Sequence, residues 1–334
     1  MFSEINYDIA IIGGGMVGLS LAYQLKNKYS DASIIIIEKE SEVGLHSSGR
    51  NSGILHAGIY YKPNSLKAKV SIEGAKRLKN WCQEEKLKIL KCGKVISPQT
   101  EDLDPQLDVL FNRAKTNGVE IEYLDEQQFK EKVPDGSTST GRSLWSPNTC
   151  VVNSKDVIQR LCERLLAKNV AFKFNTLARD FDIDKKTLII NSKDEKYIQQ
   201  TKINYNYLFN CAGINSLEIA KKFGIGEKFI TLPFKGSYWK LAKNAPFNFQ
   251  TNLYPVPDLN TPFLGIHITP SCDGSIYLGP TAIPALGLEN YYKLENIEPF
   301  FSMNFASILM KQWIYNHNGF RNTKRNKVET RRCI

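Results

Sequence analysis

Residues 7–18 read Tyr-Asp-Ile-Ala-Ile-Ile-Gly-Gly-Gly-Met-Val-Gly, and this stretch decides the fold. The apolar, β-branched run 7–12 predicts a buried strand, and the glycine cluster after it predicts a tight turn. Leucines and alanines at helical spacing predict a helix over 16–28, and a second apolar run predicts a strand over 33–38. Strand, glycine turn, helix and strand make a βαβ unit, which builds a parallel sheet.

The turn matches the dinucleotide pattern G-x-G-x-x-G through Gly13, Gly15 and Gly18. Gly13 permits the tight turn, Gly15 lets the backbone approach a pyrophosphate, and Gly18 allows close packing of helix on strand. Glu38 follows twenty positions later at the end of the second strand, where its carboxylate can accept hydrogen bonds from a ribose hydroxyl. The same carboxylate would repel a 2′-phosphate, so an NADP-type ligand is disfavoured.

The stretch 46–61 is rich in glycine and serine, yet it also carries Arg50, two histidines and two tyrosines. It follows the ribose-binding strand, so it is expected at the carboxyl edge of the sheet, where ligands bind. Hydroxyl and N–H groups can hold a pyrophosphate there, and an arginine adds charge-assisted hydrogen bonds. The further candidates for nucleotide binding are Lys39, Ser47, Ser48, Arg50, Asn51, Ser52, Gly53, Ala212 and Gly213.

Composition and charge set broad limits on function. The net charge is +10, but the tail 320–334 carries six basic residues against one acid and so contributes half of it. Such a tail is typical of a solvated segment, so no nucleic-acid partner is predicted. No apolar run is long enough to span a membrane, and no signal peptide is recognisable. We therefore expect a cytoplasmic protein, with attachment of the basic tail to an anionic inner-membrane surface as an option. The seven cysteines include no CxxC pair, which indicates free thiols and no metal site.

Further helices are predicted over 65–87, 103–117 and 153–168, and alternating aromatic and polar residues over 230–278 predict an antiparallel sheet. The expected fold class is α/β, with a Rossmann-like nucleotide domain interleaved with a β-rich (α+β) substrate domain. The predicted limits are 1–90 and 150–224 for the nucleotide domain, 91–149 and 225–300 for the substrate domain, 301–319 for a helix and 320–334 for the tail.

The run 46–61, with the residues up to Lys67 that follow it, resembles the L-2-hydroxyglutarate oxidase/dehydrogenase group of FAD enzymes, within the D-amino-acid-oxidase-like superfamily. The match extends from about residue 5 to about residue 315. The other stretches that carry it are 92–94 (Cys-Gly-Lys), 210–213 (Asn-Cys-Ala-Gly), 233–236 (Pro-Phe-Lys-Gly), 252–257 (Asn-Leu-Tyr-Pro-Val-Pro), 263–267 (Phe-Leu-Gly-Ile-His) and 278–280 (Leu-Gly-Pro).

The resemblance implies FAD as cofactor and oxidation of an (S)-2-hydroxy acid, with hydride transfer to the flavin and electrons passed on to a quinone-linked acceptor or oxygen. A small dicarboxylate is the implied substrate, and a base that titrates near neutral pH favours histidine. Of four histidines, His56 and His267 lie in family-like motifs and are the two candidates for the catalytic base. The candidates for substrate binding are Tyr60, Tyr61, Lys235 and Tyr254, although an arginine is expected where Lys235 stands.

The chain departs from the superfamily after Trp313, where no strand-glycine-helix pattern follows. We expect the C-terminal segment of the FAD domain to be missing, and the chain as a result to bind FAD weakly or to be unstable alone. Two alternatives stay open, namely an amine or amino-acid oxidase of the same superfamily and a non-catalytic protein that keeps the FAD fold.

Overall fold

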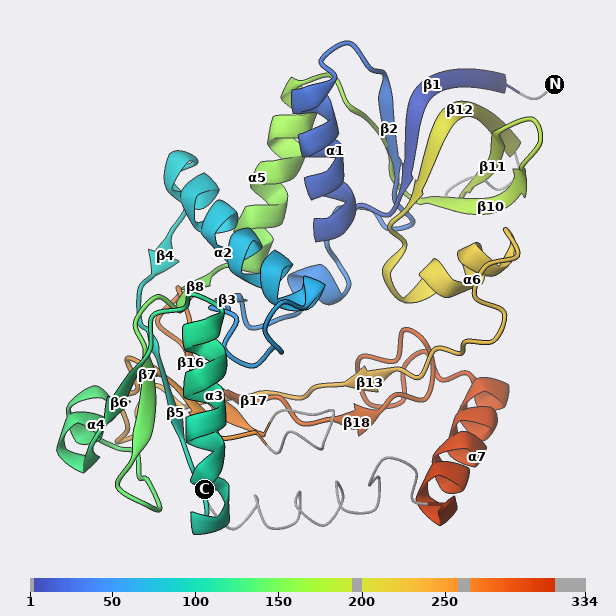
Figure 1. The fold of residues 1–334 in the computed structure, drawn as a ribbon. Helices are drawn as coiled ribbons and strands as arrows, with labels where there is room; N and C mark the ends of the chain where they lie inside the picture. Colours follow the sequence, from blue (N-terminus) through green and yellow to red (C-terminus); the bar gives the residue numbers. More distant parts are fainter. Residues whose placement is uncertain (1–2, 194–199, 258–264, 316–334) are drawn as a thin grey trace. The chain divides into compact units, whose positions relative to one another are not determined.

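The structure is a computed structural model that describes residues 3–193, 200–257 and 265–315. The chain forms two compact units, and each is built from two separate segments (Figure 1). Unit 1 contains residues 1–51 and 154–231, and unit 2 contains residues 52–153 and 232–334.

The division between the units differs from the predicted domain limits at the segment 52–90 and at two short stretches, 150–153 and 225–231. The segment 52–90 was expected with the nucleotide domain, but it belongs to unit 2. The reason is strand pairing: β3 (Ile54–Leu55) and β4 (Ile89–Leu90) both pair with β8 (Cys150–Val152), which lies in unit 2.

Unit 1 contains the predicted βαβ unit in a six-stranded sheet, and its strands follow the order β10-β11-β12-β1-β2-β9. Strand β1 pairs in parallel with β2 and β12, and β2 pairs in parallel with β9, whereas β10, β11 and β12 form an antiparallel meander. The bounds are β1 Ser3–Ile12, β2 Ile34–Ile37, β9 Ala171–Lys173, β10 Thr176–Asp182, β11 Thr187–Ser192 and β12 Gln200–Asn210.

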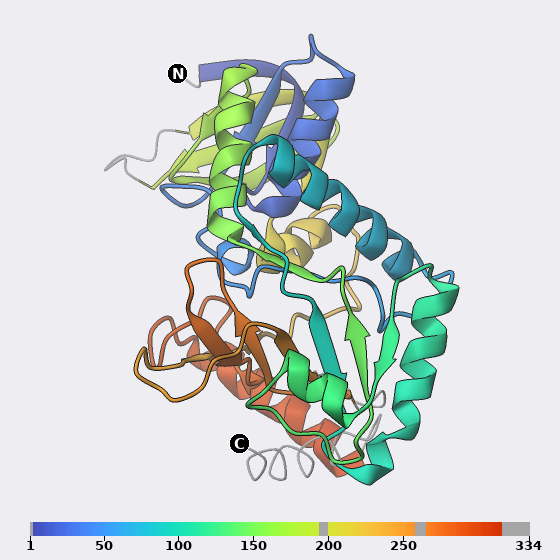
Figure 2. The ribbon, with the colours of Figure 1, turned by 90° about the vertical axis from the view of Figure 1, so that its left-hand side faces the viewer.

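Two helices of unit 1, α1 (Met16–Lys28) and α5 (Ser154–Ala167), lie side by side in both views (Figure 1 and Figure 2). Ala10 and Ile12 of β1 pack in a core cluster with residues of β11 and β12. Because side chains alternate along a strand, Ile9 and Ile11 point to the opposite face, and both are buried as well. Burial on both faces is typical of a parallel sheet and explains the unbroken apolar strands.

Unit 2 is built on a seven-stranded sheet in the order β14-β17-β16-β15-β5-β7-β6. The bounds are β5 Lys94–Ser97, β6 Glu122–Leu124, β7 Ser143–Ser146, β14 Trp239–Lys240, β15 Asn252–Pro255, β16 His267–Pro270 and β17 Ile276–Gly279. The antiparallel sheet predicted for 230–278 is confirmed, except that β15 also pairs in parallel with β5 from the other segment. That pairing joins residues far apart in sequence, so no local pattern indicates it.

Helices cover both faces of this sheet. Leu107 and Leu110 of α3 (Pro105–Thr116) pack in one core cluster with Ile96 and Tyr254. Phe129 of α4 (Glu126–Lys132) packs in another with Val95. The remaining helices and strands of unit 2 are α2 (Leu66–Glu84), β13 (Phe234–Lys235), β18 (Ile283–Pro284) and α7 (Pro299–Tyr315).

The helices predicted over 65–87, 103–117 and 153–168 are confirmed as α2, α3 and α5, each slightly shorter than predicted. Ser65 caps α2, since its side chain accepts a hydrogen bond from the N–H of Ala68. The helix predicted over 301–319 is described only as α7, and the basic tail 320–334 lies outside the described residues.

Candidate functional site

The glycine turn of unit 1 packs so closely against neighbouring backbone that side chains do not fit at two of its positions. Gly13 has a φ of 108°, and a Cβ atom there would lie 2.3 Å from the carbonyl oxygen of Cys211. A Cβ on Gly18 would lie 2.0 Å from the carbonyl oxygen of Gly13. Both positions therefore accept only glycine, and together they hold α1 against the ends of β1 and β12.

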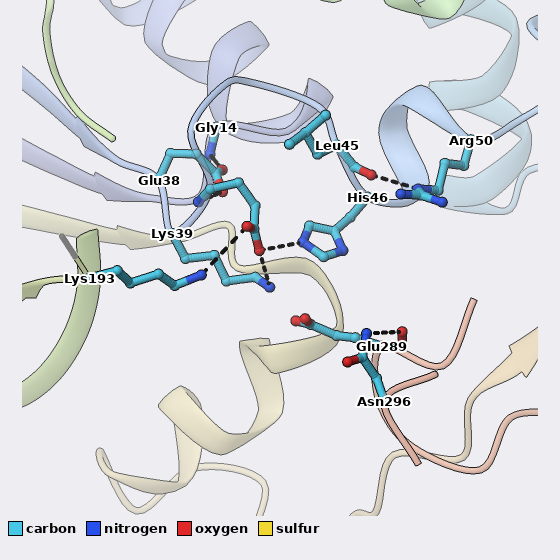
Figure 3. Close-up of polar contacts among 10 residues, drawn as sticks. Gly14, Glu38, Lys39, Leu45, His46, Arg50, Lys193, Glu289 and Asn296 are labelled. Atoms are coloured by element: carbon cyan, nitrogen blue, oxygen red, sulfur yellow. Dashed lines mark hydrogen bonds and ion pairs between the residues drawn. The ribbon is translucent and has the colours of Figure 1, made fainter. Parts of the chain in front are cut away.

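Glu38 is fixed at the carboxyl end of β2 by two backbone donors (Figure 3). Its Oε2 atom accepts a hydrogen bond of 2.7 Å from the N–H of Gly14, and its Oε1 atom accepts one of 2.9 Å from Glu40. A Cβ on Gly14 would lie 3.0 Å from that Oε2 atom and 3.2 Å from Val43. Gly14 is thus a sterically constrained position beside Glu38 that the sequence pattern, which leaves it unspecified, did not identify.

Ser48 stands at the N-terminus of α1. The helix begins after Gly15, which has no side chain to cap it, and the Oγ atom of Ser48 accepts a hydrogen bond of 3.0 Å from the N–H of Met16. Asn51 holds this serine in place, since its amide donates to the carbonyl oxygens of Ser48 at 2.6 Å and Ser47 at 3.2 Å. The predicted loop therefore reaches the helix N-terminus, where phosphate groups bind.

Lys39 and His46 lie beside Glu40, which both contact (Figure 3). Partial burial by itself raises the pKa of the Glu40 carboxyl, but the hydrogen bonds from Lys39 and His46 outweigh it and hold that pKa at about 2. The Nε atom of Arg50 donates to the carbonyl oxygen of Leu45 at 2.6 Å. Lys39 and Arg50 thus each make a contact that shapes the loop around the turn.

The other predicted nucleotide-binding residues fall into both units. Ala212 and Gly213 come after Cys211, which is the first residue beyond β12. The N–H of Cys211 donates to the carbonyl oxygen of Ile12 at 2.8 Å. Ala212 and Gly213 therefore lie beside the glycine turn. Ser52 and Gly53 belong to unit 2, where the carbonyl oxygen of Gly53 accepts the N–H of Val152 at 2.9 Å.

These features of unit 1 fit a dinucleotide. A side chain at Gly13, Gly14 or Gly18 would collide with neighbouring protein atoms, so glycine at these positions allows the tight turn and the close approach of α1 to the strands. The Glu38 carboxylate is held by backbone donors directly after β2, which is where the motif places a ribose-binding acid.

A second set of polar residues shares one face of the sheet in unit 2. Asn252 of β15 lies opposite Lys94 of β5, and Leu253 lies opposite Ile268 of β16. Because side chains alternate along each strand, the two neighbours of Leu253 and the two neighbours of Ile268 point to the face that carries Lys94. The residues brought together are Lys94, Asn252, Tyr254, His267 and Thr269.

Lys94 is fully buried and its ammonium has no hydrogen-bond partner. Its Nζ atom lies 4.5 Å from the centre of the Tyr60 ring and 5.2 Å from the centre of the Tyr254 ring. Burial lowers the pKa of this lysine to about 7. A buried cation without a counter-ion destabilises a fold, so this residue marks a place where an anion is expected.

His267 has one ring nitrogen fixed by the backbone. Its Nδ1 atom lies 3.1 Å from the carbonyl oxygen of Gly265, and since a carbonyl only accepts, Nδ1 carries the hydrogen and Nε2 keeps its lone pair. The ring stacks on Tyr254 with centroids 3.9 Å apart. Burial lowers the pKa of His267 to about 4, and the nearby Lys94 adds to this effect, so the ring is neutral at pH 7.

His56 approaches the same group of residues from the segment before α2. Its ring meets Tyr254 edge to face, with centroids 6.2 Å apart, and its Nδ1 atom is enclosed without a hydrogen-bond partner. Burial, followed by the charges of Lys94 and His267, lowers the pKa of His56 to about 3. The structure therefore brings both candidate bases together, but only His267 has a ring nitrogen held by the protein.

Three further polar atoms in this region are enclosed and unpartnered, namely the hydroxyl oxygens of Tyr60 and Thr269 and the Oδ1 atom of Asn252. The Asn252 amide is oriented by its Nδ2 atom, which donates to the carbonyl oxygen of Gly93 at 2.7 Å and to the Cys92 sulfur at 3.0 Å. Buried polar groups are normally hydrogen-bonded, so this set indicates a binding site. We call His56, Tyr60, Lys94, Asn252, Tyr254, His267 and Thr269 the buried polar cluster.

Two of the predicted substrate-binding residues make other contacts. The Lys235 ammonium donates to Oδ1 of Asn290 at 2.7 Å, which ties β13 to the turn after β18. The Tyr61 ring lies under the ammonium of Lys67 at 5.2 Å. Lys94, by contrast, was missed as a site residue. The signal available in the sequence was the stretch 92–94 (Cys-Gly-Lys), which is one of the stretches that resemble the family.

Residues 8–326 match a family described as FAD dependent oxidoreductase. The chain belongs to this family. The cofactor is therefore FAD, in agreement with the glycine turn and Glu38 of unit 1.

Several relatives are named L-2-hydroxyglutarate dehydrogenase. The protein of Salmonella houtenae is 32% identical over 91% of this chain and 71% of its own length. The mitochondrial proteins of Caenorhabditis briggsae and Homo sapiens are 36% and 34% identical over 86% of this chain, and the match covers 66% and 64% of their lengths. This chain thus spans about two thirds of the length of these relatives.

Solved structures show the same fold at lower identity. An L-alpha-glycerophosphate oxidase from Mycoplasma pneumoniae with FAD bound has a TM-score of 0.72 at 21% identity, over 90% of this chain and 78% of that one. A glycine oxidase from Geobacillus kaustophilus also has a TM-score of 0.72, at 16% identity, over 92% of this chain and 78% of that one. These neighbours confirm the predicted α/β fold class.

Two predictions about the chain as a whole can be compared with the described residues. In this part of the chain, no helix is both long and apolar enough to cross a membrane. Six cysteines are described, and all six are free thiols, as the sequence predicted.

Proposed function

We propose that this FAD-dependent oxidoreductase converts L-2-hydroxyglutarate to 2-oxoglutarate. The relatives named L-2-hydroxyglutarate dehydrogenase support the substrate, and the buried polar cluster supports the chemistry. The single observation that carries the proposal is the neutral, backbone-held His267 beside the buried Lys94, because a 2-hydroxy acid requires a base and a cation.

His267 is the proposed catalytic base. FAD, when bound, accepts the hydride that leaves the α-carbon, and the hydroxyl proton must go to a base as the C=O bond forms. The Nε2 atom of His267 keeps its lone pair because Nδ1 donates to Gly265, and a neutral ring can take the proton at pH 7. His56 serves as a second neutral group whose unpartnered Nδ1 atom can contact the substrate.

The proposed nucleotide contacts lie on unit 1. The N–H groups at the start of α1 would meet the pyrophosphate, with Gly13, Gly15 and Gly18 keeping the turn free of side chains. Glu38 would accept hydrogen bonds from the ribose.

An amine or amino-acid oxidase is the second candidate, since glycine oxidases share the fold. Such enzymes act on substrates with an amino group, which is cationic before it loses a proton. The Lys94 ammonium would repel such a group inside the same buried cluster. The cluster therefore favours a hydroxy acid over an amino acid.

We further propose that a quinone-linked acceptor or oxygen receives the electrons, and that the basic tail 320–334 permits peripheral attachment to an anionic membrane. Comparing the rates at which oxygen and a soluble quinone analogue reoxidise the reduced protein distinguishes the two acceptors.

Anaerobic flavin bleaching tests the proposed reaction. The full chain loaded with FAD is mixed with L-2-hydroxyglutarate, and absorbance is followed near ~450 nm, where oxidised flavin absorbs. Rapid bleaching by the L-enantiomer, with no bleaching by the D-enantiomer, is expected. Faster bleaching by glycine or L-glutamate than by L-2-hydroxyglutarate would instead support the amino-acid oxidase.

A further inference from the structure

The geometry points to Lys94 as the residue that binds a carboxylate of the substrate, so that this one buried cation selects anionic ligands for the cluster. This inference rests on the proposed function for the identity of the substrate, but it concerns a residue that neither the family match nor the relatives' names assign. The chemical class of the ligand is a short mono- or dicarboxylate that bears a hydroxyl group.

The first argument is the state of the ammonium. Lys94 is fully buried, its Nζ atom has no hydrogen-bond partner, and the faces of Tyr60 and Tyr254 lie beside it at 4.5 and 5.2 Å. Aromatic faces offset only part of the loss of hydration of a cation, and they supply no hydrogen-bond acceptor. The three N–H donors of the ammonium are therefore open to an anion that enters the cluster.

The second argument is the chemistry of the neighbouring groups. The hydroxyls of Tyr60 and Thr269 can donate to carboxylate oxygens, and the oriented Oδ1 atom of Asn252 can only accept. An acceptor in this position suits a hydroxyl group, whereas the cation suits a carboxylate. Cation, donors and acceptor together match the two ends of a hydroxy acid.

The third argument is the absence of a described anion among the neighbours. The groups that can carry charge in this region are His56 and Tyr60 from the segment before α2, Tyr238 before β14, Tyr254 from β15 and His267 from β16, with Cys92 before β5. Arg113 of α3 donates to the carbonyl oxygen of Tyr60 at 3.0 Å and is a further cation, and burial raises the pKa of Tyr238. Burial raises the pKa of Tyr60, Tyr254 and Cys92, so each of these stays neutral near pH 7. None of the described residues around the cluster supplies the negative charge that Lys94 lacks, and a carboxylate of the ligand would supply it.

A consequence for binding follows from the lowered pKa of Lys94, about 7 without ligand. A carboxylate beside the ammonium raises that pKa, because it stabilises the protonated form. Above neutral pH, the lysine must then take up a proton as the carboxylate binds. Proton uptake on binding is a readout that a merely structural role of Lys94 would not produce.

The test is calorimetric titration of the FAD-loaded full chain with glutarate, a dicarboxylate that cannot be oxidised at a hydroxyl group. Titrations at pH 8 in two buffers of different ionisation enthalpy measure the protons taken up. We expect uptake approaching one proton for the wild-type chain, and for Lys94→Met no uptake together with a roughly 100-fold weaker affinity. Lys94→Arg keeps the charge at this pH and is expected to bind glutarate without proton uptake.

Lys91→Met is the matched control, because Lys91 is an exposed lysine three residues before Lys94. Its affinity and proton uptake are expected to equal those of the wild type. The flavin spectrum of each variant shows that unit 1 is intact, and the melting temperature shows that the variant is folded.

The outcomes separate this inference from the proposed function. Equal glutarate affinity in the wild type and Lys94→Met, or failure of the wild type to bind glutarate, overturns the role of Lys94. Lys94-dependent binding of glutarate without bleaching by L-2-hydroxyglutarate leaves the carboxylate site standing and overturns only the proposed reaction. Bleaching by L-2-hydroxyglutarate that persists unchanged in Lys94→Met leaves the proposed reaction standing and overturns the role of Lys94.

Discussion

Two side chains on one face of the sheet in unit 2 illustrate what burial does to titratable groups. Burial disfavours the charged form, so it lowers the pKa of Lys94 to about 7 and that of His267 to about 4. The effect leaves histidine as a neutral base at physiological pH and lysine as a cation that is easily neutralised. The same physical cause thus prepares one residue for proton transfer and the other for anion binding.

The stability of the ligand-free chain should depend on Lys94 in a defined pH window. The unfolded lysine has the ordinary pKa of 10.5, and the folded one has a pKa of about 7. Between these values the unfolded state holds a proton that the folded state lacks, so raising the pH favours folding by about 1.4 kcal/mol per pH unit. Below pH 7 both states are protonated, and the full penalty of burying the cation remains.

Lys94→Met removes this penalty, so we expect the variant to be more stable than the wild type at pH 6 and the difference to shrink as the pH rises toward 10. Urea unfolding of both proteins at several pH values measures this difference in the free energy of unfolding. A difference that stays constant across pH, or a variant less stable than the wild type at pH 6, would contradict the burial of an unpaired charge at position 94.

Replacement of His267 should affect turnover far more than binding. His267→Gln removes the base, so kcat is expected to fall about 1,000-fold with little change in KM. His56→Gln should retain more activity, because no backbone contact fixes its ring as Gly265 fixes His267. Steady-state kinetics on both variants make the comparison, with flavin absorbance as the control for folding.

The pH dependence of kcat/KM tests whether the base is active in its neutral form. The base acts only when it is neutral, so kcat/KM of the wild type should fall as the pH drops through about 4. It should fall again as the pH rises above about 7, where free Lys94 loses the proton with which it binds the carboxylate. Equal losses of kcat in the two variants, or an acid limb centred near pH 6.5, would refute the assignment of His267.

At the scale of elements, the strand-turn-helix of unit 1 is determined by where side chains cannot fit. The glycines at 13, 14 and 18 each face an atom that a Cβ would meet at 3.0 Å or less. Gly74, within α2, faces open space instead, with no atom within 4 Å of the position of a Cβ. Replacement by alanine is therefore expected to be harmful at Gly14 and favourable at Gly74.

Gly14→Ala should weaken FAD binding, because its methyl group would press on the Glu38 carboxylate and on Val43. Gly74→Ala should instead stabilise the chain by about 0.5–1 kcal/mol, since alanine favours the helix. The flavin-to-protein ratio after gel filtration and urea unfolding measure the two effects. The account of the turn is wrong if Gly14→Ala retains the wild-type ratio, and Gly74→Ala controls for a general effect of added methyl groups.

At the scale of the whole molecule, the chain passes between two units at residues 51–52, 153–154 and 231–232. The nucleotide residues lie in unit 1 and the buried polar cluster lies in unit 2. Substitutions in one set should therefore leave the other readout intact.

Addition of FAD to the flavin-free chain should raise its melting temperature, because FAD binds the folded state. At a free FAD concentration 100 times the Kd, binding adds about 2.7 kcal/mol to the free energy of unfolding. The shift should persist in Lys94→Met and be reduced in Gly14→Ala. Thermal melts over a series of FAD concentrations test this. Absence of a shift for the wild-type chain, or a shift of Gly14→Ala as large as that of the wild type, would contradict the proposed nucleotide contacts.

The sequence by itself determined the βαβ unit, the place of Glu38, the helices α2, α3 and α5, and the family. The reason is that turn chemistry and hydrophobic periodicity act over a few residues, so they can be read locally. The two candidate histidines also came from sequence, through motifs that resemble a known family.

The tertiary structure alone decided which residues meet. Strand β5 pairs with β15 across more than 150 positions, and only that pairing buries Lys94 next to Tyr254 and His267. The stretch 46–61 also lies in both units, with Ser48 at the helix N-terminus in unit 1 and Tyr60 in unit 2. Burial depends on partners distant in sequence, so neither the lowered pKa of Lys94 nor its lack of a counter-ion could be read from the residues around it.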